Sequence, residues 1–107
     1  MSIRNVTTTA YAASLVVADK EATLYGVSGY NSKTSSQFIQ IHDAASLPAE
    51  SSVPKIVINA AASSAFSIDF GVNGRVFNSG VVICNSSTGP TKTIGSADCW
   101  LDAQVLT

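Results

Sequence analysis

The sequence predicts an all-β protein: a single-domain antiparallel β-sandwich, jelly-roll-like, with seven or eight short strands. Three observations support this fold class. Apolar residues alternate with polar ones along most of the chain, as in strands with one buried face. No segment shows a sustained helical stripe of apolar residues. Pro48, Pro54 and Pro90 all fall between the alternating segments, where prolines do not interrupt a sheet.

The N-terminal part of the chain is weakly patterned and rich in threonine. We therefore expect residues 1–10 to form an N-terminal arm or an edge strand, and residues 11–107 to form a single β-sandwich domain. The alternation of the next two segments predicts strands at residues 14–18 and 22–30, separated by three charged residues. By the parity of a strand, Tyr25 and Tyr30 should lie on opposite faces.

The middle of the chain contains two further alternating segments. Residues 37–43 place Ile39 and Ile41 on one face, against Phe38, Gln40 and His42 on the other. Residues 55–60 likewise alternate around two isoleucines. Both segments are expected to be strands with one face in the core.

A hairpin is predicted in the second half of the chain. Residues 66–70 alternate clearly, and Asn73-Gly74 separates them from a short return strand at residues 75–77. Asn-Gly is a strong hairpin signal, because both turn positions need a positive φ. Residues 81–84 are all apolar, which predicts a central strand covered on both faces.

The last predicted strand, residues 99–106, directs Leu101, Ala103 and Val105 inward. Trp100 then points to the opposite face. Two readings of Trp100 remain open: a residue of a core or subunit interface, or an exposed platform for a ligand.

The most unusual property of the composition is its lack of charge. The chain is 46% hydrophobic with a mean hydropathy of +0.27, and only 12% of its residues are charged. This charged share is about half of what soluble domains carry. Polar residues interrupt every apolar run before it reaches the length needed to span a bilayer. A surface with so little charge favours packing against copies of the chain or a larger body over a neutral monomer.

Charge and cysteine usage restrict partners and compartment. The net charge is −1, and the six basic residues are scattered singly, which predicts neither a nucleic-acid partner nor a membrane partner. The N-terminal residues do not resemble a secretory signal, so we expect synthesis and folding in a cytoplasm. Cys84 and Cys99 should then be reduced and buried, unless their strands are neighbours and permit a disulfide.

The titratable residues do not form a recognisable catalytic pattern. His42 is the only histidine, and its neighbour Asp43 should point to the opposite face, which rules out a dyad of the two. Asp98 and Asp102 would share a face that Asp69 could join, but no acidic loop motif or zinc-ligand spacing accompanies them. We therefore predict no catalytic, cofactor-binding or metal-binding residue, and a hydrolase would have only His42 as its base.

Several segments of the sequence, taken together, carry a resemblance to a known family. They comprise residues 24–32, 37–44, 47–49, 66–71, 74–77, 80–88 and 92–100. Together these runs, within residues 22–106, resemble a family of short virion proteins of tailed bacteriophages.

The resemblance implies a capsid decoration (cement) protein without enzyme activity, which binds the outer surface of the major capsid shell and stabilises it. The implied partners are the major capsid protein and copies of the chain itself, most commonly as a trimer. The implied location is the exterior of the capsid, after synthesis in the cytoplasm of a bacterial host. The alternative is a receptor- or glycan-binding module of a head fibre or tail, which requires Trp100, Tyr25 or Tyr30 to be exposed.

The uncharged polar segments predict where assembly contacts are made. They lie in the N-terminal segment and in the long connection before the last strand. The predicted assembly interface consists of Asn5, Thr7, Thr8, Thr9, Tyr11, Asn85, Ser86, Ser87, Thr88, Pro90 and Lys92.

Overall fold

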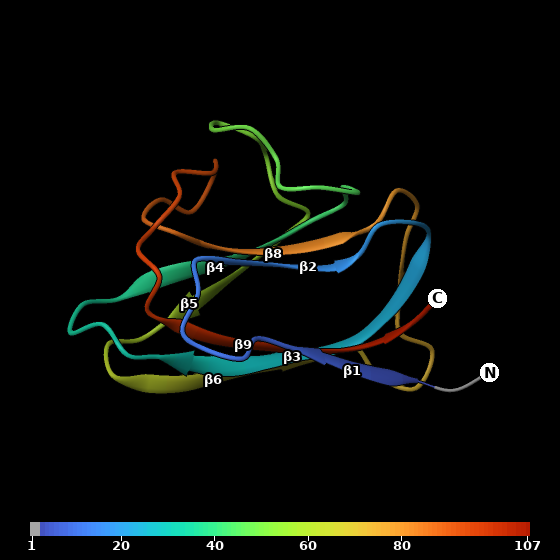
Figure 1. The fold of residues 1–107 in the computed structure, drawn as a ribbon, viewed down its shortest axis with the longest axis horizontal. Helices are drawn as coiled ribbons and strands as arrows, with labels where there is room; N and C mark the ends of the chain where they lie inside the picture. Colours follow the sequence, from blue (N-terminus) through green and yellow to red (C-terminus); the bar gives the residue numbers. More distant parts are fainter. Residues whose placement is uncertain (1–2) are drawn as a thin grey trace.

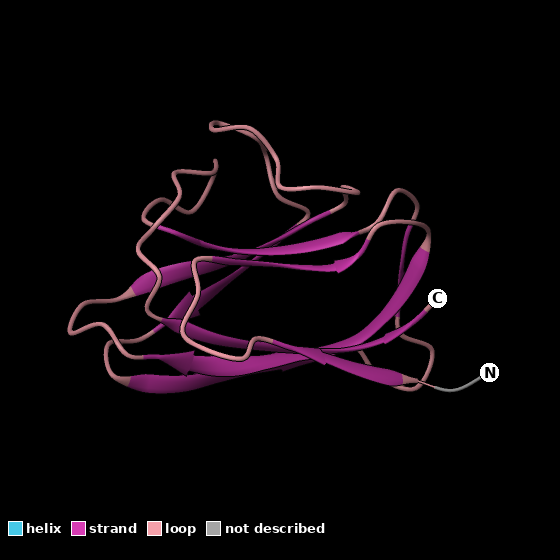
Figure 2. Ribbon diagram, in the orientation of Figure 1, coloured by secondary structure: helices cyan, strands magenta, loops and turns pink. Residues whose placement is uncertain are grey.

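The computed structural model describes residues 3–107, which form two antiparallel sheets packed face to face (Figures 1 and 2). No segment in this range forms a helix long and apolar enough to cross a membrane. The strands within this range are β1 (Arg4–Thr7), β2 (Ser14–Ala18), β3 (Ala22–Asn31), β4 (Gln37–His42), β5 (Ile56–Ala60), β6 (Ser64–Asp69), β7 (Arg75–Phe77), β8 (Val81–Ser86) and β9 (Cys99–Leu106).

The strand order is that of a jelly roll. The first sheet has the order β1-β9-β3-β6, with β7 also paired to β3, and the second sheet has the order β2-β8-β4-β5. The antiparallel pairs are therefore nested: β1 with β9, β2 with β8, β3 with β6 and β7, and β4 with β5. One long hairpin rolled up on itself gives this nesting. The predicted all-β jelly-roll sandwich is confirmed.

The predicted hairpin at Asn73-Gly74 is wrong. β6 and β7 are both antiparallel to β3 and follow one another along its edge, so they run in the same direction. The ten-residue β3 is long enough to pair with both. Residues 71–74 leave this edge as a turn, in which the Gly74 N–H donates to the Gly71 carbonyl at 3.2 Å. Counted as one interrupted strand, β6 and β7 bring the strands of residues 3–107 to eight, within the predicted number.

The core follows the predicted alternation. Ile39 and Ile41 of β4 and the inward residues of β9 are fully buried between the sheets. β8 is central in its sheet, between β2 and β4, and all six of its residues are buried, as predicted for residues 81–84. β1 occupies the edge of the first sheet, where Val6 packs against the core.

The outer faces of the two sheets differ in whether loops cover them. The loops that join β4 to β5 and β8 to β9 rise over the second sheet, as Figure 2 shows. They bury Gln40, His42 and Cys84, which belong to the outward-facing positions of β4 and β8. The first sheet presents its outer face without such a cover (Figure 1). This difference gives the molecule two distinct surfaces.

Candidate functional site

The outer face of the first sheet contains rows of side chains from neighbouring strands. The register aligns Trp100 of β9 with Tyr30 of β3, and Asp102 with Ser28. Because side chains alternate along a strand, these residues point away from the core residues between them. The register places on this face Asn5, Thr7, Thr23, Ser28, Tyr30, Ala65, Ser67, Asp69, Val76, Trp100, Asp102, Gln104 and Leu106.

An aromatic groove lies at one end of this face. It has a volume of about 470 Å³ and is lined by Ala10, Tyr11, Tyr30 and Trp100. The exposed fractions are 51% for Tyr11, 38% for Tyr30 and 39% for Trp100. The rings of Tyr11 and Trp100 pack edge to face, with centroids 6.4 Å apart and an interplanar angle of 86°.

The N-terminal segment holds Tyr11 at this groove through backbone hydrogen bonds on either side of it. The Thr8 N–H donates to the Leu101 carbonyl at 3.0 Å, and the Ala12 N–H donates to the Cys99 carbonyl at 2.8 Å. The chain between them is thereby fixed beside the start of β9. Tyr11, assigned from sequence to the assembly interface, thus belongs to the same groove as Trp100.

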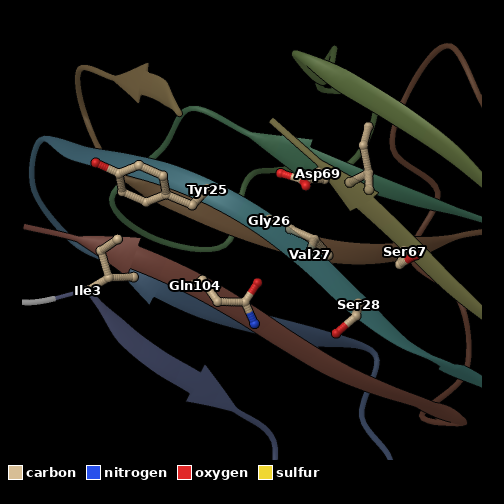
Figure 3. Close-up of a pocket in the computed structure, with 9 residues that line it drawn as sticks. Ile3, Tyr25, Gly26, Val27, Ser28, Ser67, Asp69 and Gln104 are labelled. Carbon is tan, nitrogen blue, oxygen red and sulfur yellow. The ribbon is translucent and has the colours of Figure 1, made fainter. Parts of the chain in front are cut away.

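A polar patch adjoins the groove farther along β9. The Gln104 amide nitrogen donates to Asp102 Oδ2 at 2.7 Å, and the Ser28 hydroxyl approaches the same oxygen at 3.4 Å. Figure 3 shows Ser28, Ser67 and Gln104 on adjacent strands of this face. The hollow that they line has a volume of about 420 Å³. Sequence reasoning missed Ser28 and Gln104, although the period-two spacing of Trp100, Asp102 and Gln104 was a usable signal.

The predicted parity of the two tyrosines of β3 is wrong. The pairing of β3 with β9 shifts between Leu24 and Gly26, which inserts Tyr25 as a bulge residue. A bulge resets the alternation, so Tyr25 lines the hollow on the same outer face as Ser28 (Figure 3). Tyr25 and Tyr30 therefore lie on one face.

The loops over the second sheet are held by buried polar contacts. The Gln40 amide nitrogen donates to the carbonyls of Thr88, Gly89 and Thr91, each at 2.9 Å. The buried Lys92 ammonium pairs with Glu50 of the other loop. These contacts close the loop of residues 87–98 onto β4.

The single histidine belongs to this loop support. His42 Nε2 lies 3.1 Å from Gln40 Oε1, and burial together with the positive charge of Lys92 lowers the pKa of His42. Asp43 is engaged elsewhere and accepts the backbone N–H groups of the segment before β8. The two residues thus contribute to loop structure separately.

Exposed aliphatic side chains lie on the loop side of the molecule. Val53 is 75% exposed and follows Ser52, whose carbonyl accepts the Lys92 N–H. The Ile94 N–H approaches the Glu50 carboxylate of the same pair of loops. Leu47 of the first loop and Val57 on the outer side of β5 are also exposed. We call this set the loop-side aliphatics: Leu47, Val53, Val57 and Ile94.

The structure divides the predicted assembly interface between the two sides. The N-terminal members lie beside the first sheet, and the members from Asn85 onward lie on β8 and its loop over the second sheet. Four of the side chains are buried within the chain: Thr8, Asn85, Ser86 and Lys92. The exposed members are Asn5, Thr7, Thr9, Tyr11, Ser87, Thr88 and Pro90.

The carboxylates and thiols also occupy separate places. Asp98 accepts hydrogen bonds from Gln37 and Ser96, while Asp102 faces outward on β9. Within residues 3–107, no group of three His, Cys, Asp or Glu side chains is arranged to hold a metal ion. Cys84 and Cys99 lie in different sheets as free, buried thiols, and burial raises their pKa values to about 11 and about 12.

The fold and its surfaces define a jelly-roll sandwich with an aromatic groove and a polar patch on the outer face of the first sheet and the loop-side aliphatics on the other side. No family model and no curated protein matches the chain. Among solved structures, it is similar to the coat protein of Tobacco streak virus, with a TM-score of 0.43 and 12% identity. That likeness covers 95% of this chain and 85% of the coat protein chain.

Proposed function

We propose that the protein is a non-enzymatic structural component of a virus particle, and specifically a capsid decoration (cement) protein on the outer surface of the major capsid shell. The observation that carries this proposal is the combination of a charge-poor sequence with the exposed loop-side aliphatics. Docked protein surfaces are depleted in charge and bury apolar side chains at their centre. The resemblance of residues 22–106 to phage virion proteins supports the same function.

The proposed mechanism is burial of the loop side against the shell. Val53 and Ile94 would lose water contact on docking, at a gain of roughly 25 cal/mol for each Å² of apolar surface. Ser87, Thr88 and Pro90 lie on the same loop side and would surround these apolar contacts with uncharged groups. Weak contacts repeated over a lattice add by avidity.

The proposed partners follow from this mechanism. They are the major capsid protein and other copies of the chain, with a trimer seated where capsomers meet. The protein would be located on the capsid exterior, after synthesis in a bacterial cytoplasm. A reconstruction of the parent particle by electron cryomicroscopy tests this location and the number of copies together.

Substitution of one loop-side aliphatic tests the docking surface. We expect Val53→Asp to weaken binding to particles produced without the protein by about tenfold, because a docked apolar side chain contributes about 1.4 kcal/mol. The measurement is co-sedimentation with those particles. The matched control is Val72→Asp in the turn between β6 and β7, where the valine is 94% exposed. Equal binding by both variants would contradict docking through the loop side.

A second candidate function is a receptor- or glycan-binding module of a head fibre or tail. The specific observation that favours it is the exposure of Trp100 and Tyr30 in the aromatic groove. The two candidate functions use opposite sides of the sandwich. Fluorescence of the single tryptophan tests Trp100 as its platform, since Trp100 emission that soluble quenchers do not reach in the free protein would argue against a sugar platform.

A further inference from the structure

We propose that the outer face of the first sheet binds a neutral oligosaccharide, with Trp100 as the stacking platform and Asp102 as the principal hydrogen-bonding residue. This inference rests on the second candidate function and names its ligand class and residues. The argument depends on the aromatic groove, the polar patch and the charges of the face.

The aromatic groove supplies the surface on which a sugar ring can stack. A pyranose ring has an apolar face of C–H groups, which packs against the face of an aromatic ring. Tyr11 meets the Trp100 ring edge to face, and Tyr30 is its cross-strand neighbour on β3. These contacts hold the indole in place and leave it partly exposed. The aliphatic side chains of the loop side have no such ring faces.

The polar patch supplies hydrogen-bonding groups beside the aromatic platform. Asp102 lies two residues after Trp100 on the same face, which is about 6.6 Å along a strand. Among the described residues, the hydrogen bonds to Asp102 end on Oδ2, so Oδ1 is available to accept from a hydroxyl. Ser28 adds a hydroxyl that both donates and accepts.

A glycine keeps the floor of the polar patch open. A Cβ atom at Gly26 would lie 2.9 Å from Oε1 of Gln104 and 3.2 Å from the Ile68 carbonyl. Without that atom, the Gln104 amide lies against β3 while its nitrogen donates to Asp102, and no described hydrogen bond ends on its Oε1 acceptor. The patch thus combines carboxylate, amide and hydroxyl groups next to an apolar platform, which is the composition of sites for uncharged polar ligands.

The charges of the face select a neutral ligand. The residues that the register places on it include two carboxylates, Asp69 and Asp102, and none of these described positions is Lys or Arg. A sialylated or sulfated glycan would therefore meet like charge. A second copy packed face to face would bring the same carboxylates together, which disfavours self-association through this face.

The test is an array of immobilised neutral glucans, galactans and mannans, with sialylated and sulfated glycans on the same array. We expect the intact protein to bind at least one neutral oligosaccharide. Titration with that oligosaccharide should change the emission of Trp100, the only tryptophan of the chain. Trp100→Ala should weaken binding by about tenfold or more, and Asp102→Asn by about fivefold.

Control substitutions outside the proposed site distinguish a loss of glycan binding at this site from a loss caused by any surface substitution. Val72→Ala and Asp19→Asn change exposed residues in turns, so both should bind like the unmodified protein. Circular dichroism checks that Trp100→Ala retains the fold. Trp100→Ala should also bind particles normally, because docking is assigned to the opposite side.

Other outcomes would reject the inference, and they differ in what they imply for the second candidate function. Binding to no glycan on the array rejects the inference and the glycan-binding function together. Binding to anionic glycans alone, or binding that is unchanged in Trp100→Ala, rejects the inference and retains the second candidate function. Dimerisation in analytical ultracentrifugation that Trp100→Ala abolishes would show that a second copy covers the groove, and it too rejects the inference.

Discussion

The sequence leaves open a role for His42 as a catalytic base, whereas the structure places its side chain in a buried hydrogen-bonded network. The ring is buried beneath the loop of residues 87–98, with Gln40 as its hydrogen-bond partner. A carboxylate that would orient it for base catalysis is absent from its described hydrogen bonds. The same neighbourhood contains Lys92 and Glu50, which join the two loops. His42 thus forms part of the buried polar contacts beneath this cover.

The free energy of unfolding should therefore decrease as the pH falls, because His42 becomes protonated. The folded-state pKa of His42 lies below its ordinary value of 6.5, so the unfolded chain binds more protons in the range between the two values. The stability that the neutral ring contributes is present above about pH 6.5 and is lost as pH falls through the folded-state pKa. Urea unfolding at pH 7.5 and pH 5.5 measures this change.

The control for this prediction is His42→Gln, which has no titrating ring and should lose less stability between these two pH values. The pKa values of Asp43, Glu50 and Asp98 are also lowered, by their hydrogen bonds and nearby Lys residues. Because their ordinary values are 3.8 to 4.5, their contribution is lost at lower pH. An equal decrease in both proteins at pH 5.5 would show that His42 is not responsible.

At the scale of elements, the interrupted strand β6–β7 shows what local sequence signals leave open. Asn73-Gly74 lies in a turn, but only Gly74 adopts a positive φ, of 65°, whereas the hairpin signal requires a positive φ at both positions. The direction of the chain after the turn depends on β3, whose ten residues pair with the segments on both sides. The turn lacks the positive φ at Asn73 that a two-residue Asn-Gly hairpin needs, and the pairing of both segments with β3 keeps the chain running in one direction.

The two turn glycines allow strain and crowding to be measured separately. Gly71 and Gly74 both have positive φ, but a Cβ atom at Gly71 meets nothing within 4 Å. At Gly74 it would lie 2.7 Å from Cγ2 of Thr23. We expect Gly71→Ala to lower the free energy of unfolding by about 1 kcal/mol and Gly74→Ala by about 2 kcal/mol. Urea denaturation measures both, and equal losses would contradict the crowding at Gly74.

At the scale of the whole molecule, the N-terminal strand β1 forms one edge of the first sheet and covers β9. β1 pairs with β9 over four residues, and Val6 covers part of the core. The following segment carries Tyr11 to the aromatic groove. Removal of residues 2–10 would thus alter the sheet, the core and the groove together, so such a deletion does not isolate an assembly contact.

A shorter deletion tests the closing role of β1. Removing residues 2–7 should lower the free energy of unfolding by about 2 kcal/mol or more, because it exposes apolar surface around Val6. It should also promote association, since β9 becomes an unpaired edge. Thermal unfolding and size-exclusion chromatography measure the two effects. If the deletion variant had the melting temperature of the unmodified protein and eluted as a monomer, β1 would not be needed to stabilise the sheet.

The sequence by itself determined the fold class and much of the core. The alternation around Ile39, Ile41 and Leu101 identified their buried faces, because the period of two along a strand is a local property. The continuous apolar run at the start of β8 likewise indicated burial on both faces. Charge poverty is a property of composition and required no structure.

Only the tertiary structure decided which faces remain exposed and which residues share them. The bulge at Tyr25 brings it to the face of Tyr30, and the loop of residues 87–98 buries Gln40 while the first sheet remains uncovered. Tyr11 meets Trp100 through contacts between distant parts of the chain. The physical reason is that strand register, loop packing and cross-strand neighbours depend on long-range pairing, which local alternation does not encode.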